Sequence, residues 1–359
     1  MPLRALARVN LAAIERNCRV LASAASGAEL CVVVKGDGYG HGAPPCAAAA
    51  VAGGATWLAV ASAGEAMDLR MAGIEGRLLV LGAISPEELD VALAADADLV
   101  AWSEAFADAA RGARLHVKLD TGMGRLGTRD ADLATRLAER EEVVGLMTHF
   151  ATADERGDDF LGEQLARFEE WVAPLKEARP ELVVHAANSA ATLREPRAHL
   201  DLVRCGIAVY GMDPFHEDPS GHGLEPALSL ESYAAAVKAC APGESAGYGR
   251  RFVASEPTTL ATIPIGYADG VRRGLTNNAD VLIGGRRRPL VGTVSMDNVT
   301  VEVGDDVEVG APAVLIGEQG GERILAEELA RRLDTINYEI TCGITSRVPR
   351  DYHRDGEPA

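Results

Sequence analysis

The first two thirds of the chain alternate short apolar runs with longer segments of helical character. Between residues 30 and 206, the segments that separate the apolar runs are rich in Ala, Leu and Glu. Repeated strand–helix units of this kind predict a parallel sheet covered by helices. We expect eight strands, in the runs LCVVVK, WLAVAS, RLLVLG, DLVAW, RLHVKLD, VVGLMTHF, LVVHAANS and DLVRCG.

Eight such units favour a closed (β/α)8 barrel of the TIM type, which typically occupies about 200 residues or more. An open, doubly wound sheet is the alternative. Each apolar run is followed by polar or glycine residues. Because the C-terminal ends of barrel strands form the mouth of the active site, we expect functional residues to gather there.

The pattern changes beyond about residue 225. TTLATIPIG, ADVLIGG, RPLVGTVS and NVTVEVG are short, rich in Val and Thr, and separated by turn residues, which predicts a mainly β region. RILAEELARRL predicts a helix, and a strand-like stretch reaches Ile344 before the polar tail DYHRDGEPA. The predicted fold class is therefore α/β, with a barrel domain over residues 1–225 and a β domain over residues 226–359.

Composition and charge narrow the classes of function. With 53 acidic and 35 basic residues, the net charge of −18 argues against a nucleic-acid partner, and we interpret Arg286 to Arg288 as a solvated hairpin. No apolar run reaches about 18 residues, and the start lacks the pattern of a secretory signal, so we expect no membrane span and a cytoplasmic location. The six scattered cysteines include no CxxC pair and indicate neither disulfides nor a metal site.

Lys35 is the first candidate for chemistry, in a chain that has only four lysines. It directly follows the run LCVVV and precedes GDGYGHG. Partial burial at a strand end makes a lysine amine a better nucleophile, which suits a Schiff base. The alternative is a lysine that caps the strand and extends to solvent. The glycines that follow would let the backbone approach a ligand, and Tyr39 could offer its hydroxyl to a phosphate.

VVVKGDGYGHG resembles the cofactor-lysine segment of alanine racemases, in which a lysine is followed four residues later by a tyrosine and then by GHG. The resemblance extends in the same order across nearly the whole chain, through HVKLDTGMGRLG, THFATADE, HAANSAATL, VRCGIAVYG, IPIGYADGVRR, VGTVSMDN and TINYEITCGI. The family combines a barrel that binds pyridoxal 5'-phosphate (PLP) with a β domain. That architecture agrees with the fold predicted above from the residue pattern.

The resemblance implies an isomerase that interconverts L-alanine and D-alanine, supplying D-alanine for peptidoglycan. Racemisation needs a base on each face of the α-carbon and an electron sink, which PLP provides. The resemblance assigns Lys35 as the Schiff-base lysine and first base, and Tyr248 as the second base. In the family this tyrosine comes from the partner subunit, which implies a homodimer with shared active sites. Taken alone, Tyr248 would be interpreted as a turn residue between two glycines.

The resemblance assigns His149 and Arg204 to the cofactor site, and both also support Tyr248 as a base. A phenol acts as a base near neutrality only where hydrogen bonds or positive charge stabilise its phenolate, and His149 and Arg204 match residues with that role. The counterpart of Arg204 also faces the pyridine nitrogen of PLP. Because a guanidinium can only donate, it leaves the ring unprotonated and disfavours side reactions. The alternative for Arg204 is an ion pair with Asp201 or another carboxylate.

The resemblance implies a phosphate site built from backbone N–H groups and hydroxyls. It assigns the N–H groups of Gly206 and Ile207 and the hydroxyls of Ser189, Tyr338 and Tyr39 to this site. Considered singly, Ser189 could instead be a helix N-cap, and Tyr338 a half-buried aromatic residue in a strand.

For the substrate, the resemblance assigns Arg125 to the carboxylate, with Lys118 as a lysine that is often carbamylated in the family. Lys118 could instead be an ordinary ammonium paired with Asp120. Met296 matches a residue whose backbone N–H meets the carboxylate from the partner subunit, although its side chain alone suggests core packing. Tyr267 resembles a tyrosine at a narrow entrance that favours small substrates.

The chain departs from the family pattern at GDG, where two alanines or an alanine–asparagine pair are common, and at Asn298 after SMD. Serine and broad-specificity racemases share most of the motifs and are the alternative for the substrate. A PLP carrier of the single-barrel type is a second hypothesis, which the β domain with Tyr248 and Met296 opposes. A decarboxylase of the same two-domain architecture is a third, which Arg204 opposes, since an acidic residue is expected near the pyridine nitrogen there.

Overall fold

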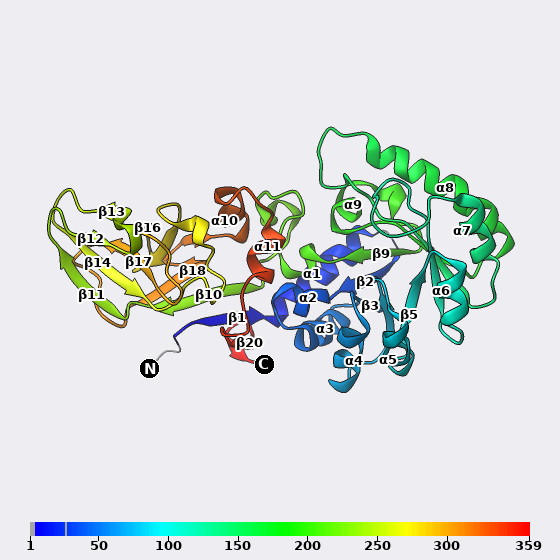
Figure 1. The fold of residues 1–359 in the computed structure, drawn as a ribbon, viewed down its shortest axis with the longest axis horizontal. Helices are drawn as coiled ribbons and strands as arrows, with labels where there is room; N and C mark the ends of the chain where they lie inside the picture. The colour runs from blue at the N-terminus through cyan, green and yellow to red at the C-terminus, as the bar shows by residue number, and fades with distance from the viewer. Residues whose placement is uncertain (1–3, 26) are drawn as a thin grey trace. The chain divides into compact units, whose positions relative to one another are not determined.

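A computed structural model describes residues 4–25 and 27–359 of the chain. These residues form two compact units, one of residues 14–225 and one that combines the N-terminal segment up to Ala13 with residues 226–359 (Figure 1). The chain passes from one unit to the other within helix α1 (Leu11–Ala24) and again after Glu225. The predicted division differs in that it assigned the whole N-terminal segment to the barrel.

Residues 14–225 form a barrel of eight parallel strands in the order β8-β7-β6-β5-β4-β3-β2-β9. Two backbone hydrogen bonds join the outermost strands, from Asp201 N to Val184 O and from Arg204 N to Ala187 O, so the sheet curls into a nearly closed barrel rather than an open sheet. All eight predicted strands are confirmed. Their bounds are β2 (Glu29–Val33), β3 (Trp57–Val60), β4 (Arg77–Val80), β5 (Asp98–Ala101), β6 (Leu115–Lys118), β7 (Val143–Met147), β8 (Val183–His185) and β9 (Leu202–Cys205).

Helices follow the strands around the barrel, as Figure 1 shows. Several begin at a polar residue whose side chain accepts a hydrogen bond from a backbone N–H of the first turn, namely Ser62, Ser103, Asp130 and Asn188. The helices are α2 (Lys35–Tyr39), α3 (Ala43–Ala52), α4 (Ala63–Met71), α5 (Leu89–Ala94), α6 (Glu104–Ala109), α7 (Ala131–Ala138), α8 (Phe160–Ala178) and α9 (Ser189–Arg194).

The other unit is mainly β, as predicted. Its large sheet has the order β11-β14-β17-β16-β15-β18-β10-β1-β20-β21, with β19 paired to β18, and β12 and β13 form a separate pair. The strands are β1 (Leu6–Asn10), β10 (Leu228–Tyr233), β11 (Ala236–Cys240), β12 (Ser245–Ala246), β13 (Phe252–Val253), β14 (Thr258–Ile263), β15 (Asp280–Ile283), β16 (Arg286–Val291), β17 (Val299–Val303), β18 (Pro312–Gln319), β19 (Glu322–Ile324), β20 (Arg350–Arg354) and β21 (Glu357–Pro358). The predicted helix is α10 (Ala326–Arg332).

One prediction for the end of the chain is wrong. The strand-like stretch before Ile344 contains helix α11 (Asn337–Cys342), whose buried residues Asn337, Ile340 and Thr341 follow helical spacing. The polar tail forms β20, which pairs in parallel with β1. No residue of β20 is fully buried, so its backbone pairing rather than an apolar pattern makes it a strand.

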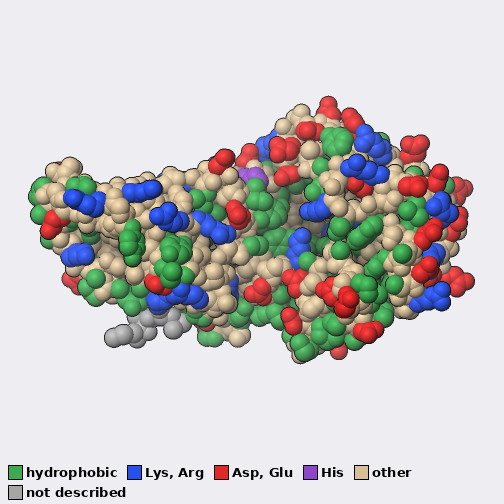
Figure 2. Space-filling model, in the orientation of Figure 1, with side chains coloured by type: hydrophobic (Ala, Val, Ile, Leu, Met, Phe, Trp, Pro, Cys, Tyr) green, Lys and Arg blue, Asp and Glu red, His purple; other side chains and the backbone are tan. Residues whose placement is uncertain are grey.

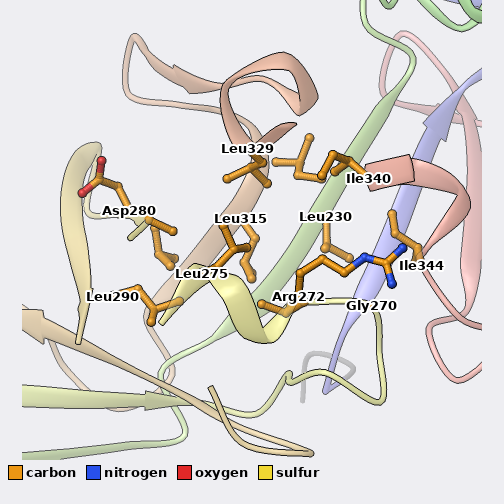
Figure 3. A pocket seen from close by; sticks show the side chains of 14 residues that line it. Leu230, Gly270, Arg272, Leu275, Asp280, Leu290, Leu315, Leu329, Ile340 and Ile344 are labelled. Atoms are coloured by element: carbon orange, nitrogen blue, oxygen red, sulfur yellow. The ribbon is translucent and has the colours of Figure 1, made fainter. Parts of the chain in front are cut away.

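The core of the β unit contains a small cavity of about 30 Å³, room for a water molecule or two. Apolar side chains from β10, β18, α10 and α11 point into it, among them Leu230, Leu315, Leu329 and Ile340 (Figure 3). None of the residues predicted to act in catalysis or binding lines this cavity. It is a packing feature of the core.

The surface carries mixed charge. On the face shown in Figure 2, basic side chains are scattered among the acidic ones rather than gathered in one broad patch. Arg286 to Arg288 lie in the β15–β16 hairpin, as predicted, and Arg287 and Arg288 form ion pairs with Glu328 and Asp306. Within residues 4–25 and 27–359, no helix combines the length and the apolar character needed to cross a membrane.

Candidate active site

Lys35 follows β2 and is partly buried at the start of an unusual turn. The next four residues all have positive φ, 63° at Gly36, 52° at Asp37, 62° at Gly38 and 53° at Tyr39. Each non-glycine residue in this left-handed region costs about 1–2 kcal/mol, whereas glycine adopts it readily. The two glycines of GDG therefore halve the number of strained positions, which gives a physical reason for this departure from the family pattern.

Hydrogen bonds hold this left-handed turn in place. The Asp37 carboxylate accepts from Ala43 N at 2.9 Å. Gly36 N donates to one carboxylate oxygen of Glu65, and Ala61 N donates to the other, each at 2.7 Å. Glu65 thus ties the Lys35 turn to the end of the neighbouring strand β3.

Tyr39 and Ser189 meet at Gly206, just beyond the end of β9. A Cβ atom on Gly206 would lie 2.2 Å from the Tyr39 hydroxyl oxygen, so only glycine leaves room for this hydroxyl. Ser189 Oγ accepts from Gly206 N at 3.0 Å and from Ala208 N at 3.4 Å. Asn188 caps α9, which excludes the N-cap interpretation of Ser189. Ile207 follows Gly206 directly, so two hydroxyls and a run of backbone N–H groups converge here.

Arg204 is 3% exposed and lies on β9, next to β2. Its guanidinium donates to His185 Nδ1 at 2.8 Å, to the carbonyl oxygens of Thr148 and Ala186 at 2.9 and 3.0 Å, and to His149 Nδ1 at 3.2 Å. The acceptors that the structure describes for Arg204 are thus imidazole nitrogens and backbone carbonyl oxygens, and none of them is a carboxylate. Burial lowers the pKa of Arg204 to about 10, which leaves the guanidinium protonated near neutrality.

The alternative ion pair for Arg204 is excluded, because Asp201 binds Lys176 Nζ at 2.8 Å instead. His149 lies beside Arg204 at the end of β7. Burial lowers the pKa of His149 well below its usual value, and the charge of Arg204 lowers it further. The His149 imidazole is therefore neutral.

Lys118, at the end of β6, is 4% exposed. Burial lowers its pKa to about 8, and the nearby charges of Arg204 and Arg125 contribute. The Asp120 carboxylate instead binds Arg129 and the backbone N–H groups of Gly122 and Gly124. Lys118 therefore carries an amine that is easily deprotonated. Arg125 is exposed in the loop between β6 and α7.

The predicted barrel residues create a strongly positive region. Lys35, Lys118, Arg125 and Arg204 all act electrostatically on His149 and lower its pKa. Like charges gathered at one end of a barrel repel each other unless an anion is bound between them. The region is therefore suited to a ligand that carries phosphate and carboxylate groups.

The remaining candidates belong to the β unit. Tyr248, in the short helix Tyr248–Arg250, is 75% exposed, and its carbonyl accepts from Thr293 Oγ1. Tyr267 and Met296 are 42% and 51% exposed, and backbone hydrogen bonds join their two segments. Met296 therefore does not pack in the core, which excludes that alternative. Tyr338 lies on α11, so it is not the strand residue that was the alternative.

Three buried side chains that were not predicted from the sequence continue from Arg204 into the barrel, namely His185, His116 and Asp98. The sequence offers only an indirect signal for these side chains. Histidines stand inside two of the apolar strand runs, and Gly145 interrupts a third, although interior glycine is unfavourable in a strand.

Comparison with known proteins gives a consistent result over both units. The family model described as "Alanine racemase, N-terminal domain" matches residues 9–214, and the one described as "Alanine racemase, C-terminal domain" matches residues 227–352. The alanine racemase of Symbiobacterium thermophilum is 45% identical, covering 96% of each chain, and that of Frankia casuarinae is 43% identical, covering 98% of this chain and 96% of the relative.

Solved structures agree with the sequence relatives. A structure of alanine racemase from Bacillus anthracis with bound L-Ala-P is 38% identical, with a TM-score of 0.93 over 100% of this chain and 97% of the other. An alanine racemase from a D-cycloserine-producing Streptomyces lavendulae is 37% identical, with a TM-score of 0.92 over 98% of each chain.

Proposed function

The chain belongs to the alanine racemase family, and we propose that it is a PLP-dependent isomerase that interconverts L-alanine and D-alanine. One observation carries the proposal. Lys35, the group of hydroxyls and N–H groups around Gly206, and the buried guanidinium of Arg204 all lie at the C-terminal ends of barrel strands. This is the end at which barrel enzymes build their active sites.

The barrel residues fit PLP in charge and in their hydrogen-bonding groups. The positive charges of Lys35, Arg125 and Arg204, which act on His149, match the cofactor's negative charge. We assign Lys35 to covalent attachment of the cofactor, and the hydroxyls of Tyr39 and Ser189 and the N–H groups of Gly206 and Ile207 to its phosphate. Tyr338 is the further hydroxyl in this assignment. When bound, PLP supplies the electron sink that makes the α-proton of an amino acid acidic.

Two bases move the α-proton. We assign them as the amine of Lys35 on one face of the substrate and the hydroxyl of Tyr248 on the other. With the cofactor bound, Arg204 would donate a hydrogen bond toward the pyridine nitrogen while keeping its own proton, which would leave that nitrogen unprotonated and the electron sink moderate. The neutral imidazole of His149 is held beside Arg204 at 3.2 Å and supports this guanidinium.

Arg125 and the backbone N–H of Met296 are assigned to the substrate carboxylate, and Tyr267 to the entrance. Tyr248, Tyr267 and Met296 are all exposed on the β unit, so they are available to a second copy of the chain. We therefore propose a homodimer in which the β unit of one subunit completes the active site of its partner. The proposal includes a cytoplasmic location, where D-alanine enters peptidoglycan precursors.

Chiral chromatography of the purified protein with PLP tests the proposal directly. L-alanine should convert to an equal mixture of L- and D-alanine, and L-serine run in parallel should react much more slowly. Comparable rates with both amino acids would instead support the alternative of a broad-specificity racemase. No change of handedness in either amino acid would overturn the proposed function.

Replacing Gly206 by alanine should weaken PLP binding. The new Cβ would displace the Tyr39 hydroxyl, which lies 2.2 Å from its position. Because hydrogen bonds to charged groups contribute about 1.5–3 kcal/mol, we expect the affinity for PLP to fall roughly ten- to a hundredfold. Titration of PLP-free protein with PLP, followed by absorbance, measures this. Gly162→Ala in α8, where a Cβ meets no atom within 4 Å, is the matched control and should bind as wild type.

Lys118 should be carbamylated, and increasingly so as the pH rises. Only a neutral amine reacts with carbon dioxide, and the neutral fraction of Lys118 grows as the pH rises through its pKa of about 8. A carbamate signal in ¹³C NMR with labelled bicarbonate should therefore be stronger above this pH than below it. Lys118→Ala should lack the signal. A signal of equal strength in that variant would assign the modification to another amine.

A further inference from the structure

A continuous series of side-chain hydrogen bonds crosses the interior of the barrel. It runs from Arg204 Nη1 to His185 Nδ1 at 2.8 Å, from His185 Nε2 to His116 Nδ1 at 2.7 Å, and from His116 Nε2 to Asp98 Oδ2 at 3.2 Å. Arg204 is 3% exposed, and the other three side chains are fully buried. Buried polar groups are costly unless they are fully hydrogen-bonded, so such a network constrains the positions of all its members.

A glycine makes the central link possible. His116 lies on β6 and His185 on β8, so the His116 ring must pass over the strand between them, β7. A Cβ at Gly145 of β7 would lie 2.2 Å from His116 Nδ1, the atom that binds His185. Gly145 has no positive φ, so a larger residue is excluded here by space alone.

The two ends of the network determine every proton in between. A guanidinium can only donate, so His185 Nδ1 must accept from Arg204. Since burial lowers the pKa of His185 well below its usual value, its single proton is on Nε2 and is donated to His116 Nδ1. The proton of His116 must then be on Nε2, where it is donated to the Asp98 carboxylate. Each donor along the series thus points from the cation toward the anion.

Asp98 is fixed at the opposite end of the barrel from the active site. It is the first residue of β5, and its carboxylate also binds Arg77, the first residue of β4, and Arg114, which directly precedes β6. Burial by itself raises the pKa of Asp98, but the hydrogen bonds from His116, Arg77 and Arg114 bring it below its usual value. The carboxylate is therefore ionised near neutrality.

We propose that Asp98 is a positioning residue for Arg204, and that it acts through His116 and His185 across the barrel. This inference rests on the proposed function for its catalytic consequence, because Arg204 is the group assigned to the pyridine nitrogen. The carboxylate fixes the tautomer of both imidazoles, and His185 then offers Arg204 an acceptor in one fixed direction. The guanidinium is thereby held in place without a carboxylate beside it that would compete for its donors.

The first test uses the PLP-free protein and needs no activity. In ¹⁵N NMR of the labelled histidines, His116 and His185 should both be neutral with the proton on Nε2 near neutral pH. Single His→Gln variants assign the signals. A proton on Nδ1 of either ring, or a charged imidazole, would overturn the proposal. Gly145→Ala should change the signals of both rings, whereas Gly64→Ala, whose Cβ would lie 3.9 Å from its nearest neighbour, should change neither.

The second test asks whether Asp98 acts through the histidines. In the holoenzyme, Asp98→Asn and Gly145→Ala should each lower kcat roughly ten- to a hundredfold, as loss of an outer partner of a functional histidine does, with little change in KM. The double variant should be no slower than the slower single variant, because both changes break the same network. Asp108→Asn, which removes an exposed ion pair with Arg140, is the charge control and should leave kcat unchanged.

The outcomes separate the inference from the proposed function. If the wild-type enzyme racemises no amino acid, the proposed function fails, and the NMR signals still decide whether the network exists. If the two single effects multiply in the double variant, Asp98 and His116 act independently and the inference is wrong. If Asp98→Asn does not fold, Gly145→Ala carries the same test, since an unchanged kcat together with displaced histidine signals would overturn the proposal.

Discussion

Lys35→Ala should abolish both racemisation and the covalent attachment of PLP. The amine is assigned to two roles, as the group that holds the cofactor and as the base on one face of the substrate. Loss of a positioned base alone costs about 10²–10⁴-fold in rate, and loss of the attachment adds to this, so we expect activity to fall by at least roughly a thousandfold. The absorbance of the lysine-bound cofactor should disappear at the same time.

The control for this result is Lys176→Ala. Lys176 forms an ion pair with Asp201 and is not among the groups assigned to PLP. This variant should keep both activity and cofactor absorbance. Racemisation at the wild-type rate by Lys35→Ala would remove Lys35 from the mechanism and leave the left-handed turn around it without a catalytic explanation.

Tyr248→Phe should lose racemisation by roughly 10²–10⁴-fold while keeping the absorbance of bound PLP. The change removes one hydroxyl from a side chain that is 75% exposed, so the fold should be unaffected. In D2O, one enantiomer of alanine should still exchange its α-proton at the Lys35 face, whereas the other should not. NMR measures this exchange. Exchange of the α-proton without a change of handedness would identify Tyr248 as the second base.

Tyr267→Phe is the matched control, since Tyr267 is also an exposed tyrosine of the β unit, assigned to the entrance rather than to proton transfer. In D2O, this variant should exchange the α-proton of both enantiomers of alanine. If Tyr248→Phe exchanged the α-protons of both enantiomers equally, the assignment of Tyr248 as the second base would be wrong.

Mixing the two inactive variants tests the shared active site. A heterodimer of Lys35→Ala and Tyr248→Phe has one intact site if each site takes Lys35 from one subunit and Tyr248 from the other. Statistical exchange in a twofold dimer should then restore about a quarter of the wild-type activity. If Tyr248 serves the active site of its own chain, the mixture stays inactive.

Much of the fold was predictable because local pattern and tertiary structure agree in the barrel. Most residues of the barrel strands are apolar and buried, as in Trp57–Val60, and such runs are recognisable without knowledge of their neighbours. Tertiary contacts decide the rest. Asn337–Cys342 was predicted to be strand-like but forms a helix. No element was predicted for the polar segment Arg350–Arg354, which is a strand because β1, from the other end of the chain, pairs with it.

The residues of the candidate site also fall into two groups, those that sequence motifs identify and those that only the structure shows. Motifs identified Lys35, Tyr39, Ser189, Arg204 and Gly206, and the structure brings together the last four around the ends of β8 and β9 next to β2. The roles assigned to them stay predictions. The histidines behind Arg204 carry no motif, since a histidine within an apolar run has the same local appearance whether it is isolated or hydrogen-bonded.

The sequence by itself determined the family through its motifs, and it determined the eight strand segments of the barrel and the residue types at the strand ends because these are local properties. Only the tertiary structure decided that β1 belongs to the β unit, that the turn after Lys35 is left-handed, and that Gly145 leaves space for a link between His116 and His185. Each of these depends on atoms from segments far apart in the chain, whose approach no local pattern encodes.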